Sequence, residues 1–258
     1  MYPKRYLAWV AVELPDAGPV GRELALACER FRDGPFGQPA NATTSLAFCV
    51  AAVLIAAGRT PGRPRPTGAR WWFAALVFAV GAGSWVQHGP HPAWQAYAHD
   101  LPLATLLGFV AADAAADLTG RRRPRYGWLL TPVAMVPVVA IGPVASSLTQ
   151  GVLGAVAIGL NLLRAKARPR LRRVLLPALA VLAAGALLGS LTDRTALCAP
   201  DRLWQGHAAW HVLAATAVWL LAPAIGERDR PADRLRGRSG WLRGRPAERR
   251  LAPEAESA

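Results

Sequence analysis

Two histidines, His207 and His211, stand one helical turn apart in the segment CAPDRLWQGHAAWHVLAA, residues 198–215. Residues four apart lie on one face of a helix, so both imidazoles can bind the same metal ion. A third histidine, His88, closes an apolar run that ends in SWVQH. Three histidines from two helices leave the fourth position of a zinc ion open for water, as a catalytic zinc requires. The HxxxH spacing is equally typical of a polar helix end at a membrane surface, so spacing alone leaves both interpretations open.

Ser84 and Asp100 complete the set of candidate catalytic side chains. Ser84 lies one turn before His88, and Asp100 opens the apolar run that begins HDLPL. Asp100 is placed to act on a metal-bound water, but Asp followed by Leu and Pro is also a common helix N-cap. Ser84 fits a helix-packing hydroxyl as well. We expect the other two histidines, His91 and His99, to be solvated loop residues.

The elements that must position these side chains are apolar blocks. The chain has 258 residues, of which 53% are hydrophobic and 18% charged, and nearly all charges fall outside the blocks. Block lengths match helices that cross a hydrocarbon core, so we expect an all-α, seven-transmembrane-helix bundle. The expected spans are 44–58, 71–88, 101–118, 126–141, 144–163, 174–191 and 206–225.

Basic residues give the orientation. The segments 59–70, 121–125 and 164–173, together with the tail from Gly226, hold 23 of the 30 Lys and Arg residues. By the positive-inside rule, these segments face the cytoplasm and the N-terminus lies outside. Five basic residues before Asp33 oppose this orientation. The orientation brings all five histidines to one membrane level, although it was argued without them.

We expect three parts: an extracytoplasmic N-terminal segment at 1–43, a membrane domain at 44–225 and an Arg-rich, disordered cytoplasmic tail at 226–258. YLAWVAVEL, near the N-terminus, fits an interfacial helix and shows no clear signal-peptide pattern. The net charge of +14 faces anionic lipid in this topology, so we predict no nucleic-acid partner. The preference for Arg over Lys, and for Ala and Gly, indicates a bacterial chain of high genomic GC, and hence the bacterial inner membrane.

Three motifs together resemble the alkaline ceramidase group of the CREST superfamily of membrane hydrolases. They are CERFRDGPFGQPANATTSLAF, then SWVQH followed by HDLP, then LCAPDRLWQGHAAWH. The resemblance runs in order from Cys28 to Leu221. Its most specific element is the last, in which a cysteine and a short loop precede HxxWH.

The resemblance implies a seven-helix fold, zinc held by His88, His207 and His211, and hydrolysis of an N-acyl lipid such as ceramide. Zinc lowers the pKa of bound water and polarises a carbonyl, which allows attack on an unreactive amide. Asp100 would take the proton of the water, and Ser84 would donate a hydrogen bond to the developing oxyanion. The expected partner is a lipid with an acyl chain, held in an apolar slot of the bundle.

The N-terminal motif departs from the family pattern. NATTSLAF stands where NTxSNLAF is usual, so Thr44 and Ser45 replace Ser and Asn. Some relatives bind calcium through acidic residues here; Glu29 remains, but Gln38 takes an acidic position, so the motif leaves open whether a calcium site exists near Glu29. Cys28 and Cys198 both fall outside the membrane, where an oxidising exterior would permit a disulfide; two free thiols are the alternative.

Two other classes of function fit parts of the pattern. A seven-helix receptor or transporter could hold a metal or haem at the HxxxH pair, with Asp113 as a proton-relay residue. We expect Asp113 to be buried against the bundle and Asp117 to be interfacial. A membrane scaffold without chemistry is the third possibility, and it leaves the shared level of the histidines unexplained.

Overall fold

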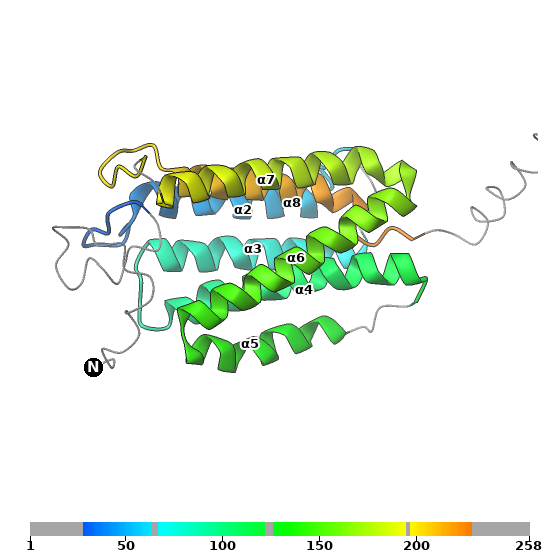
Figure 1. The fold of residues 1–258 in the computed structure, drawn as a ribbon, viewed down its shortest axis with the longest axis horizontal. Coiled ribbons are helices and arrows are strands. Elements are labelled where there is room, and N and C mark those ends of the chain that lie inside the picture. The colour runs from blue at the N-terminus through cyan, green and yellow to red at the C-terminus, as the bar shows by residue number, and fades with distance from the viewer. Residues whose placement is uncertain (1–27, 63–66, 122–125, 195–196, 229–258) are drawn as a thin grey trace, which may run out of the picture. The chain divides into compact units, whose positions relative to one another are not determined.

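The computed structural model describes residues 28–62, 67–121, 126–194 and 197–228, and every regular element in these ranges is helical. The interfacial helix expected near the N-terminus and the tail beyond Arg228 lie outside the described residues. Three 3-10 turns are η1 (Gly127–Leu129), η2 (Pro169–Leu171) and η3 (Ala222–Ala224). The long helices are α2 (Pro39–Ala56), α3 (Gly68–His88), α4 (Gln95–Thr119), α5 (Leu130–Ile141), α6 (Pro143–Ala167), α7 (Arg172–Arg194) and α8 (Gly206–Leu221) (Figure 1).

Six helices, all of the long ones except α5, are long and apolar enough to cross a membrane. The remaining expected span, 126–141, corresponds to η1 and α5, which form a shorter apolar helix, Gly127–Ile141. At 1.5 Å per residue, the 12 residues of α5 span about 18 Å, against a hydrocarbon core of about 30 Å. The structure confirms a helical bundle of membrane type with six clear spans.

The break after α5 is set by one glycine. Gly142 has a φ of 140°, and Pro143 begins α6 directly after it. Glycine reaches this φ without a steric penalty, and proline suits the first position of a helix because its missing N–H needs no partner there. Only Gly142 therefore separates α5 from α6, whereas the expected spans left two residues, 142 and 143, between these helices.

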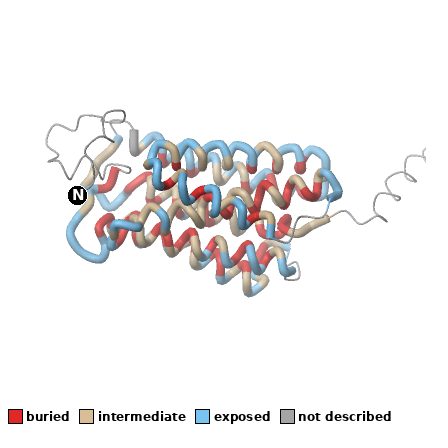
Figure 2. Tube along the Cα trace, turned by 90° about the horizontal axis from the view of Figure 1, so that it is seen from below, coloured by how far each residue is buried: buried red, intermediate tan, exposed pale blue. Residues whose placement is uncertain are grey.

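The helices form a bundle with its core between α2, α3, α4 and α8. α3 packs between α2 and α4, and α8 packs between α2 and α7. α4 also packs against α6, with α5 at the edge. Figure 2 shows buried residues on the sides of helices that face one another. Phe73 of α3 and Phe109 of α4 stack at 6.2 Å between ring centroids and have no exposed surface.

The outer surface of the bundle is apolar along its length and aromatic near both ends. Large aliphatic side chains of α5 and α6, including Leu130 and Leu148, are exposed. Trp71 is exposed at the start of α3, and Trp94 lies exposed just before the antiparallel helix α4. Tryptophan is enriched at the two interfaces of a membrane, so this distribution fits a bundle surrounded by lipid.

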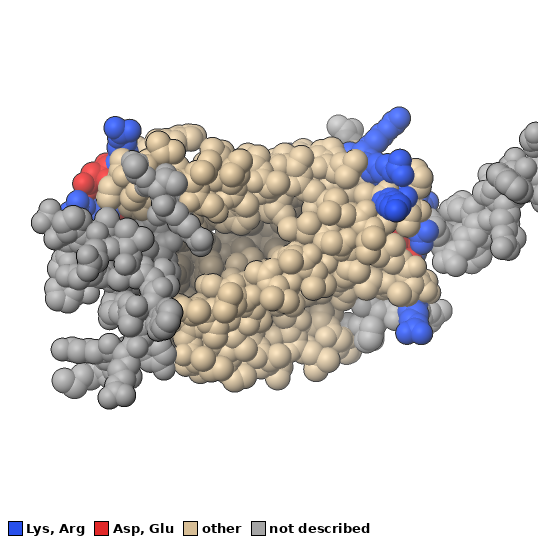
Figure 3. Space-filling view, in the orientation of Figure 1, with Lys and Arg blue, Asp and Glu red and all other residues tan. Residues whose placement is uncertain are grey.

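Lysine and arginine gather at one end of the bundle, where α3 begins and α4 and α6 end (Figure 3). This matches the basic segments counted in the sequence. Two of the counted residues are buried inside the bundle, however. Arg70 lies in α3 and is 4% exposed, and Arg164 lies in α6 with no exposed surface. Each is buried because a carboxylate and several carbonyl groups lie around it.

Arg164 is the centre of a buried ion network. Its Nε donates to Asp117 Oδ2 at 2.7 Å, and its Nη1 lies 3.3 Å from Asp113 Oδ2. Its Nη2 donates to the carbonyl of Ala224. Asp113 is buried as expected, but the expectation of an interfacial Asp117 was wrong: it is 2% exposed. The arginine on another helix supplies the charge that allows this burial.

Arg70 fixes the same end of the chain. It donates to the carbonyls of Ala222 and Pro223 and pairs with Glu227 at 2.9 Å. Together with Arg164, it therefore holds η3 and the residues after it against α3 and α6.

Replacing Arg164 with methionine is expected to lower the free energy of unfolding by about 3–5 kcal/mol, because Asp113 and Asp117 each lose a buried ion pair and Asp117 keeps only the longer one with Arg168, at 3.6 Å. Unfolding of the purified protein in detergent micelles measures this. Arg173→Met, at an exposed position of α7, is the matched control and should change stability by about 0.5 kcal/mol or less. An equal loss of unfolding free energy in the two variants would contradict the stabilising role given to the Arg164 ion network.

Candidate metal centre

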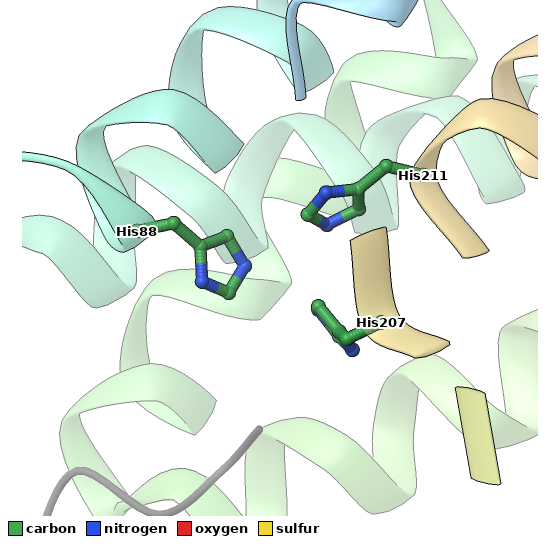
Figure 4. A group of neighbouring side chains, drawn as sticks. All are labelled: His88, His207 and His211. Atoms are coloured by element: carbon green, nitrogen blue, oxygen red, sulfur yellow. The ribbon is translucent and has the colours of Figure 1, made fainter. Parts of the chain in front are cut away.

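Three histidines meet at the other end of the bundle, where α3 ends and α8 begins. His88 is the last residue of α3, and His207 and His211 occupy the first two turns of α8. One ring atom of each lies within 4.8 Å of the other two, and the ring centroids are 4.7 to 5.0 Å apart. Figure 4 shows the side chains approaching one another from the two helices. The prediction that distant histidines share one place is confirmed.

His88 is oriented by a glutamine from the segment before α2. Its Nδ1 lies 2.6 Å from Gln38 Oε1, and both side chains are buried. The amide group of Gln38 in turn donates to the carbonyl of Glu29 at 2.6 Å. Because the amide oxygen is an acceptor, His88 carries its hydrogen on Nδ1, which leaves Nε2 as the nitrogen for a metal.

His211 is oriented in the same way from α2. Its Nδ1 donates to the backbone carbonyl of Asn41 at 3.1 Å, with the hydroxyl groups of Thr44 and Ser45 at 3.2 and 3.4 Å. Its Nε2 lies 3.3 Å from Ser84 Oγ. Thr44 and Ser45 thus lie against a predicted metal ligand.

Partners on Nδ1 are typical of metal-binding histidines, because they fix the ring and its tautomer. Gln38 and Asn41 have this role for His88 and His211. Sequence patterns did not identify either contact, since both join segments far apart in the chain. The only signal in the sequence was position: Asn41 opens the NATTSLAF motif at the start of α2, and Gln38 lies three residues before it.

Changing Gln38 to leucine is expected to weaken zinc binding about 10- to 100-fold, because His88 loses the group that orients it. Competition with a chromophoric chelator measures the affinity. Gln87→Leu is the matched control, since Gln87 Oε1 has no hydrogen-bond partner among the described atoms. The role of Gln38 is refuted when both variants bind zinc like the unmodified protein.

Glu29 caps α2. Its two carboxylate oxygens accept hydrogen bonds from the backbone amides of Ala40 and Asn41, each at 2.8 Å. Pro39 begins the helix and has no amide hydrogen, so these are the first amides that need partners. A carboxylate at a helix N-terminus also interacts favourably with the helix dipole. The structure therefore gives Glu29 a capping role.

A disulfide joins Cys28 to Cys198, with 5.4 Å between the Cα atoms. It ties the segment that carries Glu29 and Gln38 to the loop before α8. Arg30 adds an exposed ion pair with Asp201 across the same two segments. The disulfide thus links the segment before α2 covalently to the loop before α8, the helix that carries His207 and His211.

Ser84 lies within the cluster, as the sequence predicts. Its hydroxyl is 2% exposed and lies 2.8 Å from Ser45 Oγ and 3.3 Å from His211 Nε2. It is one turn before His88 on α3, so helical geometry places it on the same side. A hydroxyl at this position can donate to an oxygen atom bound next to the histidines.

Asp100 is not a helix cap, because α4 begins five residues earlier, at Gln95. Its Oδ1 lies 2.7 Å from His99 Nδ1, and its Oδ2 accepts a hydrogen bond from Ser146 of α6. The expectation of a solvated loop for His99 was also wrong. His99 lies in α4, partly buried, with its ring centroid 6.5 Å from that of His88. His91 lies in the loop between α3 and α4 and is also partly buried, with its Nδ1 2.6 Å from the carbonyl of Gln87.

A close approach of α3 and α4 brings Asp100 and His99 to the cluster. Pro102 lies inside α4 and has no amide hydrogen to give to the carbonyl of Ala98. At that point α3 carries Gly83, where a Cβ atom would overlap the Ala98 oxygen. Glycine therefore allows the contact, one residue before Ser84.

The fold and this cluster define the class: a helical membrane protein with three buried or half-buried histidines gathered at one end. No protein-family model matches the chain, and no curated protein matches it.

The donor set fits zinc. Three imidazole nitrogens are a usual set for a catalytic zinc ion, and the oxygen atoms of Gln38, Asn41, Thr44, Ser45 and Ser84 around them are neutral hydrogen-bond partners and not competing charges. Two of the rings already present a fixed Nε2. His88 and His211, and Ser84 between them, are nearly fully buried.

Proposed function

We propose that this protein is a zinc-dependent membrane amidase that hydrolyses an N-acyl lipid, ceramide or ceramide-like, to a fatty acid and an amine. The observation that carries the proposal is the cluster of His88, His207 and His211, with two of the rings held by partners on Nδ1. The resemblance of its three motifs to alkaline ceramidases supports the choice of reaction.

Zinc bound to the three histidines would lower the pKa of water and polarise the substrate carbonyl. Ser84 is placed to donate a hydrogen bond to the carbonyl oxygen as that atom gains negative charge. Both oxygens of Asp100 are already engaged, so we assign proton transfer to the Asp100–His99 pair. Asp100 would hold the hydrogen on Nδ1, and Nε2 of His99 would take a proton from the attacking water and then give it to the leaving amine nitrogen.

The bundle offers a route for an acyl chain. α6 packs on α4, whereas α7 packs on α8, and Figure 3 shows the surface hollowed between α6 and α7. The exposed side chains of α6 that border lipid, Val152 and Val156 among them, are apolar. A substrate could therefore enter from the membrane with its amide near the histidine end.

We place the histidine end outside the cytoplasm and the arginine end inside, in the inner membrane of a bacterium. The gathering of Lys and Arg at one end supports this orientation. The seven-span topology that it requires counts η1 and α5 as a span, which a tilted or locally thinned bilayer could accommodate. A disulfide at the histidine end agrees with an oxidising exterior.

The test of the function combines two measurements on purified full-length protein in detergent. Metal analysis is expected to find about one zinc per chain. Mass spectrometry after incubation with ceramide, dihydroceramide and simpler N-acyl amines should detect released fatty acid from at least one of them. Protein that contains zinc but releases no acid from any N-acyl lipid contradicts the proposal.

A further inference from the structure

α6 contributes two polar side chains to the histidine end of the bundle. Ser146 is 1% exposed, and its hydroxyl donates to Asp100 Oδ2. The amide of Gln150, one turn further along α6, donates to Ser146 Oγ at 3.0 Å. The next residue, Ser147, is exposed. Of these two adjacent serines, only Ser146 is buried and hydrogen-bonded to the Asp100 carboxylate.

The hydrogen-bond chain continues from Asp100 to the edge of the metal centre. Asp100 Oδ1 lies 2.7 Å from His99 Nδ1, and the His99 ring is the neighbour of His88. Each step has a defined direction: Gln150 donates to Ser146, and Ser146 donates to Asp100. Asp100 only accepts, so Nδ1 of His99 carries a hydrogen and Nε2 remains for another partner.

The hydrogen bond from Ser146 of α6 restricts the orientation of the Asp100 carboxylate. Asp100 and Ser146 lie on different helices, 46 residues apart. A carboxylate with only one partner can rotate about its side-chain torsions, and the imidazole bound to it then moves too. A buried donor to the second oxygen removes this freedom, and a hydrogen bond to a charged group is among the stronger ones in proteins.

We propose that Ser146 and Gln150 are positioning residues of the hydrolytic site: they fix Asp100, which orients His99 so that its Nε2 accepts a hydrogen bond from the attacking water. This inference rests on the proposed function for its reaction. The series of hydrogen bonds from Gln150 to His99 does not depend on the proposed function and can be tested separately.

The first test reads the geometry and requires no activity. In full-length protein labelled with 15N-histidine, NMR reports the hydrogen-bonding state of both ring nitrogens, and the chain has only five histidines. His99→Gln assigns the relevant signals. Ser146→Ala is expected to shift the Nδ1 signal of His99 and to leave those of His88 and His211 unchanged. Ser147→Ala is the matched control and should shift none of them.

The second test reads the reaction. Ser146→Ala should lower kcat roughly 10- to 100-fold, as expected for losing a hydrogen bond to a charged group, with KM and zinc content unchanged. Ser146→Thr keeps the hydroxyl and should restore most of kcat. Gln150→Leu keeps Ser146 and should give a smaller loss, which provides a second variant when Ser146→Ala does not fold.

The two proposals fail in different ways. Unmodified protein that hydrolyses no N-acyl lipid refutes the proposed function. The NMR signals of His99 then still show whether Ser146 orients Asp100 and His99. Active protein whose Ser146→Ala variant keeps full kcat and an unshifted His99 Nδ1 signal overturns the positioning proposal and leaves the amidase standing. A His99 shift in Ser147→Ala as large as that in Ser146→Ala also overturns it.

Discussion

Alanine at His211 is expected to reduce bound zinc from about one ion per chain to nearly none, and to abolish hydrolysis of the lipid substrate. His211 is 3% exposed and held by Asn41 on Nδ1, so its Nε2 is fixed in place for a metal before the metal arrives. Two remaining imidazoles give an incomplete set for tetrahedral zinc. Metal analysis and fatty-acid release, measured on the same samples, test this.

A matched control is available at His91, which lies outside the cluster. Its φ of 47° is in the left-handed region, where asparagine is tolerated better than most residues. His91→Asn should therefore keep the backbone turn, the zinc and the activity. Zinc retained at full occupancy in His211→Ala would show that the ion binds elsewhere.

Alanine at Asp100 is expected to lower turnover about 10²- to 10⁴-fold, the range of general acid–base catalysis, and to leave zinc bound. The carboxylate contacts His99 and Ser146 and not a metal ligand. Its removal therefore disorganises proton transfer without opening the histidine cluster. Kinetics and metal analysis of the variant separate these two effects.

Asp201→Ala is the control for Asp100. Asp201 lies at the same end of the bundle but is exposed, in an ion pair with Arg30. Surface ion pairs contribute little to stability, so this variant should behave like the unmodified protein. Activity retained by Asp100→Ala would remove Asp100 and His99 from the proposed mechanism.

A receptor or transporter with haem at the HxxxH pair makes a different prediction, because bound haem gives a Soret absorption band. Colourless protein that contains zinc would disfavour it. The structure also bears on Asp113, the proton-relay candidate in that alternative. Asp113 pairs with Arg164 and accepts from the amide of Gly226. These contacts favour a structural role.

The helices were predictable because their apolar blocks are long and nearly free of charge. The shared position of His88, His207 and His211 was predictable too, since alternating orientation of successive spans brings their ends to one level. The start of α4 was not. Pro102 normally marks a helix start, but here Gly83 on the neighbouring helix gives space to the carbonyl that Pro102 leaves unpaired.

The polar partners of the site could not be predicted, because each comes from a distant segment. Gln38 reaches His88 across 50 positions, and Ser146 reaches Asp100 across 46. Ser146 lies in no motif, and the motif that contains Gln38 pointed to a calcium site and not to a histidine. Arg164 was misplaced for the same reason: a basic residue at a helix end looks like a loop charge until its carboxylate partners on α4 are known.

The most direct test of the central claim is X-ray absorption at the zinc edge on the purified protein. Three histidines around one ion predict three nitrogen ligands at about 2.0–2.1 Å, with one further light-atom ligand to complete a tetrahedral set. The same measurement on His88→Ala should lose this signature. Zinc that is absent, or surrounded by oxygen or sulfur ligands only, would contradict the account.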